Sequence, residues 1–322
     1  MHIPDGFLDA KTAISTGLFS LTGLGAALRI TGKKTESKRI PLFGLAAAFV
    51  FVAQMINFPV ASGTSGHLLG ATLVTVLLGP SAAVIVMSSV VIIQSLLFAD
   101  GGILALGANI FNMAIVAPLL GNAIYKIVRS VLRDDRGRLI AASVAAWCTI
   151  VVVAVVCAME LAWSGTTPLR LVVPAMAGIH MAIGLGEAAI TMLVLSAIAK
   201  TRPDLLNGNK VVALQSGDKR LPFPGILLFL GLLLLMVPLA SEFPDGLERV
   251  AHTLGFAQKV GADGVSISPF RDYLVPGIHS AFVSTIVAAI VGALVVFVLS
   301  IAMARVLVPR AQSVDELKTE VD

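Results

Sequence analysis

The chain has little charge: Asp, Glu, Lys and Arg make up only 13% of its 322 residues. An ordinary soluble domain carries about 25%. Hydrophobic residues reach 57%, and the mean hydropathy is +0.94. This balance excludes a soluble globular enzyme, a disordered tail, a collagen-like fibre and a nucleic-acid module. The composition instead predicts a polytopic membrane protein.

Cysteine is almost missing, since Cys148 and Cys157 are the only two. They lie in one apolar run without a CxxC or CxH pattern, which predicts two buried thiols and neither a disulfide framework nor a thiolate metal site. The chain also lacks HExxH, which argues against a zinc protease of that type. No nucleophile or acid–base constellation is visible, so an intramembrane enzyme is disfavoured.

Apolar runs long enough for membrane helices recur along the chain. A spanning helix needs about 20 mostly apolar residues. Gly79-Pro80-Ser81 divides the stretch 68–98 into two arms, as a turn between antiparallel helices or as a kink. We predict two helices there and an all-α fold of about nine spans, near residues 12–30, 40–57, 68–78, 82–98, 102–125, 139–163, 171–199, 223–241 and 278–307.

The basic residues predict the orientation, because cytoplasmic loops collect Lys and Arg. With the amino terminus outside and nine spans, most of the 23 basic residues fall inside. The first apolar run has one basic residue before it, Lys11, and a cluster of basic residues after it, which is the reverse of a secretory signal. We therefore expect the first helix to be retained. With nine spans, the carboxyl terminus is then cytoplasmic. The inside residues are Arg29, Lys33, Lys34, Lys38, Arg39, Lys126, Arg129, Arg133, Arg136, Arg138, Lys200, Arg202, Lys210, Lys219, Arg220, Arg305, Arg310 and Lys318.

The amino-terminal sequence Met1-His2-Ile3-Pro4-Asp5-Gly6 contains a compact chelate. The Met1 amine, the deprotonated His2 amide and the His2 imidazole can face one metal ion. Three coplanar nitrogens suit Ni²⁺ or Cu²⁺, with Co²⁺ also possible. Pro4-Asp5-Gly6 is a turn that returns the terminus toward the protein.

His67 is the candidate for the missing ligand. It lies in an outer loop of small and polar residues, on the side predicted for the amino terminus. Asn57, Thr64 and Ser65 are candidates for fixing the histidine tautomer or the loop shape around it. The alternative is a Ser/Thr helix cap followed by an ordinary histidine at a membrane interface.

Both motifs carry a family resemblance. Met1-His2-Ile3-Pro4-Asp5-Gly6 and Gly63-Thr64-Ser65-Gly66-His67-Leu68-Leu69-Gly70 resemble the NikM/CbiM-type substrate-binding (S) component of energy-coupling factor nickel/cobalt transporters, over about residues 1–205. A second pair of motifs resembles the NikN/CbiN-type (PDGLE) accessory subunit: Ser241-Glu242-Phe243-Pro244-Asp245-Gly246-Leu247-Glu248 and Asp272-Tyr273-Leu274-Val275-Pro276-Gly277.

The resemblance implies a division of the chain into units. Residues 1–205 would form the metal-binding membrane domain and 206–222 a cytoplasmic linker. The second unit, 223–310, would have two helices around the external loop 242–277, and 311–322 would form a polar tail. The chain would then be a seven-helix S component fused to a two-helix accessory unit.

The resemblance also implies a site and a function. Met1, His2 and His67 would bind Ni²⁺ or Co²⁺ as transported substrate, with no catalytic residue and no cofactor. The protein would sit in the prokaryotic cell (inner) membrane. It would work with a transmembrane coupling (T) protein and two cytoplasmic ATPases, because it carries no GxxxxGK[ST] pattern of its own. The Pro-Asp-Gly start favours nickel over cobalt.

Several ionisable residues leave alternatives open. His180 and Glu187 share a helical face within a predicted span. They are candidates for a proton relay in a stand-alone metal permease or channel, or for a hydrogen-bonded pair that holds the bundle together, which we favour. Glu160 is predicted at the membrane interface, and His252 and His279 as solvated or capping residues. The external loop 242–277 leans acidic, which suits weak cation attraction or simply a solvated loop.

Overall fold

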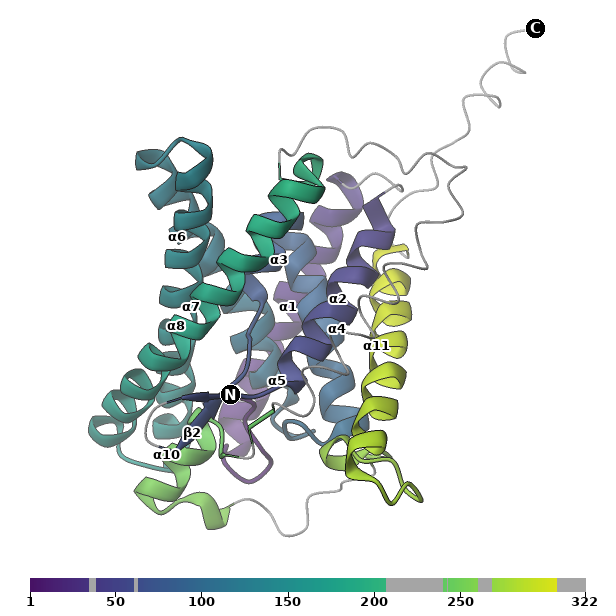
Figure 1. Cartoon of the computed structure of the whole chain (residues 1–322). Helices are drawn as coiled ribbons and strands as arrows, with labels where there is room; N and C mark the ends of the chain where they lie inside the picture. Colours follow the sequence, from purple (N-terminus) through teal and green to yellow (C-terminus); the bar gives the residue numbers. More distant parts are fainter. Residues whose placement is uncertain (35–38, 61–62, 207–239, 242, 260–267, 306–322) are drawn as a thin grey trace, which may run out of the picture.

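The computed structural model describes residues 1–34, 39–60, 63–206, 240–241, 243–259 and 268–305. The predicted linker 206–222, the predicted helix 223–241 and the predicted tail 311–322 lie outside the described residues, except for residues 206 and 240–241. The fold is mostly helical (Figure 1), as predicted. The helices are α1 (Ala10–Lys34), α2 (Ile40–Met55), α3 (Ala71–Leu78), α4 (Pro80–Phe98), α5 (Leu106–Ile110), the π-helical η2 (Phe111–Val116), α6 (Ala117–Val131), α7 (Asp135–Trp163), α8 (Leu169–Thr201), α10 (Gly246–Leu254) and α11 (Ala281–Arg305).

Within the described residues, six helical segments are long and apolar enough to cross a membrane: Ala10–Lys33, Pro80–Phe98, Leu106–Val131, Asp135–Trp163, Leu169–Thr201 and Ala281–Arg305. α2 is apolar but shorter. The exposed faces of α1 and α8 carry large apolar side chains such as Phe19 and Leu193. Such faces are stable against lipid and costly in water, so the chain is a multi-pass membrane protein.

The break at Gly79 separates two helices, as predicted. Gly79 has φ +87°, a conformation that glycine adopts without strain. α3 ends before it, and α4 begins at Pro80, where the missing proline N–H costs nothing. α3 has eight residues, too few to cross a membrane alone. Residues 67–70, which form neither helix nor strand, connect β2 to α3.

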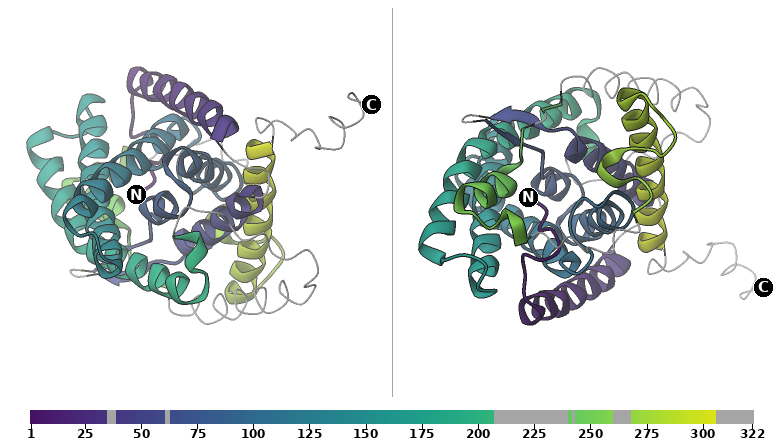
Figure 2. Two further views of the ribbon diagram at one scale, coloured as in Figure 1. Left: turned by 90° about the horizontal axis from the view of Figure 1, so that it is seen from above. Right: turned by 90° about the horizontal axis from the view of Figure 1, so that it is seen from below.

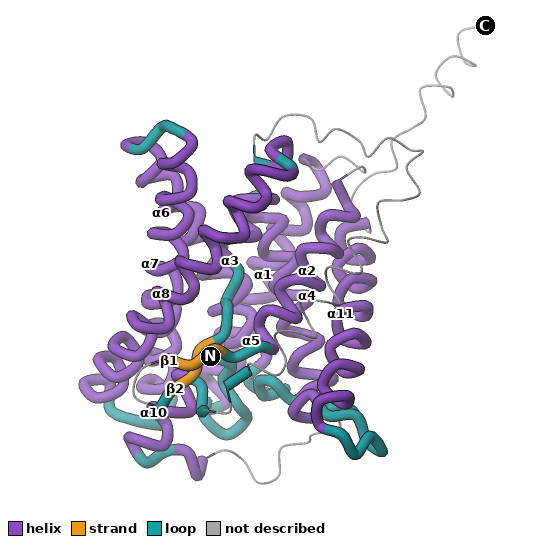
Figure 3. The backbone as a smooth tube through the Cα atoms, in the orientation of Figure 1, coloured by secondary structure: helices purple, strands orange, loops and turns teal. Residues whose placement is uncertain are grey.

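A short β-hairpin lies beside the amino terminus (Figure 3). β1 (Phe58–Val60) pairs antiparallel with β2 (Thr64–Gly66), and Phe58 faces Gly66. A Cβ on Gly66 would lie 2.5 Å from Cγ2 of Ile183 on α8. This position therefore accepts only glycine, which lets the hairpin press against α8 and presents His67 to the interior.

α10 and α11 are the described α-helices in the part of the chain that is predicted to form the second unit. The Asp245 carboxylate caps α10 by accepting from the Glu248 N–H at 2.8 Å, and Gly255 ends the helix at φ +77°. α10 packs on α8, and α11 packs along α2 and α4. α10 therefore lies beside the amino terminus, whereas α11 lies on the other side of the bundle (Figure 2).

The amino terminus lies inside the ring of helices in both views of Figure 2. The α6–α7 turn and the carboxyl end of α8 lie at the end of the bundle away from it (Figure 1). Met1, Ile3 and Phe7 are buried. The first residues of the chain are thus a core element, and the backbone and amine of Met1 are held inside the protein.

Candidate metal-binding site

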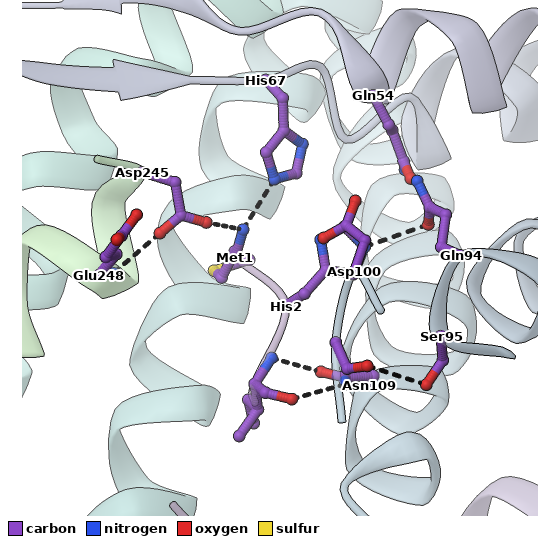
Figure 4. Close-up of polar contacts among 12 residues, drawn as sticks. Met1, His2, Gln54, His67, Gln94, Ser95, Asp100, Asn109, Asp245 and Glu248 are labelled. Carbon is purple, nitrogen blue, oxygen red and sulfur yellow. Dashed lines mark hydrogen bonds and ion pairs between the residues drawn. The ribbon is translucent and has the colours of Figure 1, made fainter. Parts of the chain in front are cut away.

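The amine of Met1 is the centre of a buried cluster of polar groups (Figure 4). It lies 2.7 Å from Nε2 of His67 and 2.7 Å from Oδ2 of Asp245. These partners are 66 and 244 residues away in the chain. Three segments far apart in sequence therefore meet at one nitrogen.

The amino-terminal segment is held by hydrogen bonds to the α4–α5 connection and to Asn109 of α5. The Ile3 N–H donates to Oδ1 of Asn109 at 2.8 Å, and Nδ2 of Asn109 donates back to the Ile3 carbonyl at 3.0 Å. The Gly102 N–H donates to the same carbonyl at 2.9 Å. The Asp5 carboxylate accepts from the Leu104 N–H at 2.8 Å, and Gly6 has φ +91°. The predicted turn at Pro4-Asp5-Gly6 is confirmed.

The His67 loop is anchored by Glu187 of α8. Its carboxylate accepts from the N–H groups of Leu69 at 2.6 Å and Gly70 at 2.9 Å. Nδ1 of His67 lies 3.2 Å from the Leu68 carbonyl, which can only accept. Nδ1 therefore carries the hydrogen, and the Nε2 lone pair faces the Met1 amine.

Both ring nitrogens of His2 have partners. Nδ1 lies 2.9 Å from Oδ1 of Asp100, and Nε2 lies 3.1 Å from Oε1 of Gln94. The His2 ring stacks on the His67 ring, with centroids 5.3 Å apart and an interplanar angle of 22°. Among the described residues, none accepts a hydrogen bond from the His2 backbone N–H. Buried amides without a partner are rare.

Burial and charge set the protonation of these groups. Burial, together with the positive Met1 amine, lowers the pKa of His67 from 6.5 to about 3, so the ring is neutral and able to bind a metal ion. Burial alone would raise the pKa of Asp245, but the Met1 amine holds it well below its usual range. Likewise, His2 outweighs burial and holds the pKa of Asp100 well below its usual range. Both carboxylates are therefore negative beside the two amino-terminal residues.

The structure brings Met1, His2 and His67 together, as the sequence predicts. Asn57, Thr64 and Ser65 brace the loop before His67. The Ser65 N–H and hydroxyl donate to the carbonyls of Pro244 at 2.9 Å and Phe243 at 2.7 Å, and the Asn57 carbonyl accepts from the Ser241 N–H at 2.8 Å. Thr64 pairs with Val60 in the hairpin. The hydrogen bonds of the His67 ring go instead to the Met1 amine and the Leu68 carbonyl.

Four residues of the cluster were not predicted from the sequence: Asp245, Asp100, Gln94 and Asn109. Asp245 lies in a Pro-Asp-Gly sequence that is typical of a solvated turn. In the sequence, only the acidic character of the loop 242–277 indicated that cations could bind there. Gln94 and Asn109 are polar residues inside apolar runs, and this is the pattern that could have identified them. Asp100 follows directly on the apolar run of α4.

His180 and Glu187 share a buried face of α8 but do not form the favoured hydrogen-bonded pair. Nδ1 of His180 lies 2.7 Å from the Met176 carbonyl, while Glu187 binds the backbone after His67. Both residues are 1% exposed. Glu187 is thus a support of the His67 loop, and His180 lines the small cavity beside Met1, His67 and Asp245.

The remaining predictions have mixed outcomes. Glu160 lies near the end of α7, is buried and accepts from Nδ2 of Asn112 at 2.6 Å. The π-helical turn η2 brings Asn112 inward against α7.

His252 and His279 are exposed, as predicted, and His252 lies 3.9 Å from Glu248. Both cysteines are free thiols, and Cys148 is only partly buried.

The cluster differs from a side-chain metal site. Among the described residues, no three His, Cys, Asp or Glu side chains are grouped to hold a metal ion. A site here must use backbone nitrogens as well. The Met1 amine and the His2 amide are the available ones.

Comparison with known proteins gives two family matches. The model described as the cobalt uptake substrate-specific transmembrane region, CbiM, matches residues 2–205, and the PDGLE domain matches residues 219–309. The chain is 36% identical over 314 residues to a putative fused nickel transport protein NikMN of Archaeoglobus fulgidus, covering 95% of this chain and 98% of that protein. It is 32% identical to a fused nickel transport protein NikMN of Rhodobacter capsulatus, covering 82% and 81%.

Solved structures give the same result. A truncated transition metal transporter superposes with a TM-score of 0.57 at 36% identity, covering 62% of this chain and 99% of that one. The CbiM match spans more than half of the chain, and the match to the fused relative extends over almost all of it. The chain therefore belongs to the CbiM family of substrate-specific transmembrane transport proteins and carries a PDGLE domain after the CbiM region.

Proposed function

We propose that this protein is the substrate-specific component of an ATP-driven nickel or cobalt transporter, and that Met1, His2 and His67 bind the transported ion. The observation that carries the proposal is the 2.7 Å separation between the Met1 amine and Nε2 of His67. Two nitrogens in neighbouring positions of a square plane lie about 2.8 Å apart when each metal–nitrogen bond is about 2.0 Å. The amine and His67 are already spaced as one edge of such a plane.

His2 would complete the plane with its amide nitrogen and Nδ1. The amine, the amide and Nδ1 form two fused chelate rings, and His67 takes the fourth position. The His2 N–H supports this assignment, because its deprotonation breaks no hydrogen bond within the described part of the chain. Nδ1 must turn from Asp100 toward the ion. Metal loading in this proposal therefore includes a rotation of the His2 ring.

The donor set explains selectivity. Four nitrogens in a plane suit Ni²⁺ and low-spin Co²⁺. Mg²⁺ and Ca²⁺ prefer oxygen ligands, and Zn²⁺ prefers a tetrahedral site. We favour nickel as substrate. Both fused relatives named above are described as nickel transport proteins, which supports this preference.

Energy would come from separate subunits. The sequence contains no GxxxxGK[ST] pattern for nucleotide binding. We infer a transmembrane coupling protein and two cytoplasmic ATPases as partners, with the amino terminus and the site on the outer face, as the distribution of Lys and Arg favours. The protein would capture the ion outside and deliver it for uptake.

Metal competition on tag-free protein tests the proposal. Purified protein is dialysed against equimolar Ni²⁺ and Co²⁺ with excess Mg²⁺ and Zn²⁺, and its bound metal is analysed. We expect one Ni²⁺ per chain and a visible absorption band of planar Ni²⁺. Bound zinc in excess of nickel would contradict the planar site. In cells that lack coupling proteins, metal uptake by this chain alone would contradict the need for partners and favour the stand-alone permease.

A further inference from the structure

Two side chains of the second unit reach the proposed metal site from different sides. Oδ2 of Asp245 accepts from the Met1 amine at 2.7 Å. The Tyr273 hydroxyl donates to Oδ2 of Asp100 at 2.6 Å, and the other oxygen of Asp100 lies 2.9 Å from Nδ1 of His2. Figure 4 shows Asp245 and Asp100 on either side of the Met1–His2 segment. Asp245 and Tyr273 both lie in the PDGLE region, whereas His2, His67 and Asp100 lie in the CbiM region.

Asp245 is held in place by four contacts of its segment. Its Oδ1 caps α10 through the Glu248 N–H at 2.8 Å. The carbonyls of Phe243 and Pro244 accept from Ser65 in the hairpin that carries His67. Gly246 packs so closely on α8 that a Cβ there would lie 2.7 Å from Cε1 of His180. The carboxylate therefore belongs to a fixed surface that covers the amine.

Tyr273 is held in a similar way. Its ring stacks on Phe98 at the end of α4, with centroids 4.8 Å apart and an interplanar angle of 20°. The Phe270 N–H donates to the Leu97 carbonyl at 2.9 Å. Asp272 and Tyr273 have φ +54° and +60°, which non-glycine residues adopt only where surrounding contacts hold them. This turn directs the hydroxyl at Asp100.

The charge balance of the metal site indicates what these two contacts do. A divalent ion on four nitrogens receives at most one negative charge from its donors, that of the deprotonated His2 amide. Positive charge in a buried site needs a nearby counter-charge. A metal-bound amine still has N–H groups to donate to Asp245, so that contact persists in the loaded state. Asp100, held by Tyr273, supplies the second negative charge beside His2.

We propose that Asp245 and Tyr273 are positioning residues of the metal site, so that the site is completed by the second unit. Asp245 orients the amine and balances the charge of the ion. Tyr273 fixes Asp100, so that a negative charge stays beside the His2 ring when Nδ1 turns toward the ion. This inference rests on the proposed function, since it assigns partners to the same four nitrogens.

Variants of the full chain test the inference. Asp245→Asn keeps the helix cap but removes the charge, and Tyr273→Phe keeps the ring on Phe98 but removes the hydroxyl. We expect each to raise the Ni²⁺ dissociation rate, measured by transfer to a chelator, about 10-fold or more. The visible band of planar Ni²⁺ should stay close to that of the wild type, because the four donors are unchanged.

Exposed neighbours provide matched controls. Glu248→Gln on α10 and Asp272→Asn beside Tyr273 alter side chains that are 61% and 76% exposed. Both should dissociate within about twofold of the wild type. If Asp245→Asn does not fold, Asp245→Ser keeps a cap that is too short to reach the amine. Wild-type dissociation rates in the Asp245 and Tyr273 variants would overturn the inference.

His67→Ala separates this inference from the proposed function. If the wild type shows the planar band and His67→Ala abolishes it, the four-nitrogen site holds. Unchanged rates in the Asp245 and Tyr273 variants would then overturn only the role of the second unit. Absence of the planar band in the wild type would overturn both.

Discussion

The Met1 amine and Nε2 of His67 lie 2.7 Å apart, although 66 residues separate them in the chain. The contact joins the first atom of the chain to a loop held by β2 and α8. Neither partner can move freely, because Asn109 fixes the backbone after Met1 and Glu187 fixes the backbone after His67. This fixed contact leads to four predictions.

Addition of one glycine before Met1 should abolish tight Ni²⁺ binding. It converts the amine into an amide and moves the new amine away from His67. Loss of an outer hydrogen-bond partner of a metal ligand costs about 10–100-fold in affinity, and loss of a ligand should cost more. Equilibrium dialysis measures the effect, with the same glycine added after Asp322 as a control. Full affinity in the amino-terminal variant would refute the role of the Met1 amine.

His67→Ala should lose tight binding and keep the fold. The buried ring contacts the Met1 amine, the Leu68 carbonyl and the His2 ring, all within the site, whereas the loop itself is held by Glu187. Titration calorimetry checks binding, and melting of the purified protein checks folding. His252→Ala, at an exposed position, is the control. Retained tight binding in His67→Ala would contradict the four-nitrogen plane.

Metal binding should release the proton of the His2 amide, because this nitrogen must be deprotonated to act as a ligand. His67 contributes none, because its pKa of about 3 leaves it neutral. Affinity should therefore fall as the pH falls from 7 to 5, while His67 becomes protonated only near pH 3. Calorimetry in buffers of different ionisation enthalpy counts the protons. A release of no protons would contradict a deprotonated amide ligand.

Glu187→Ala should destabilise the protein and weaken metal binding together. The change leaves the N–H groups of Leu69 and Gly70 buried without a partner. Each such group costs about 1–3 kcal/mol. Glu187→Gln keeps one acceptor and should recover part of both losses. Thermal unfolding and Ni²⁺ titration of the two variants provide the measurements, and a stable Glu187→Ala variant that binds normally would rule out this supporting role.

The sequence predicts the central features because they depend on local patterns. Apolar runs predict the helices, Gly79-Pro80 predicts the break, and the sides of successive loops predict that Met1 and His67 meet. The contact of Asp245 with Met1 could not be predicted in this way. It depends on the packing of α10 on α8, and a Pro-Asp-Gly sequence is equally typical of a solvated turn.

Two other contacts could not be predicted for similar physical reasons. Glu160 lies near the end of an apolar run, and the π-helical turn η2 places Asn112 against it. Thr64 and Ser65 hold the loop before His67, but they do so through strand pairing and through contacts with residues 243–244. In both cases a tertiary contact decided the role of a polar residue.

The burial of the Met1 amine has a consequence for how the protein is made. A formyl or acetyl group on this nitrogen would remove its lone pair and its charge, and it would have to fit between His67 and Asp245. A chain that carries such a group could bind the metal ion only after an enzyme has removed the group from Met1. The fraction of unblocked chains in a preparation, measured by mass spectrometry, should equal the number of Ni²⁺ ions bound per chain.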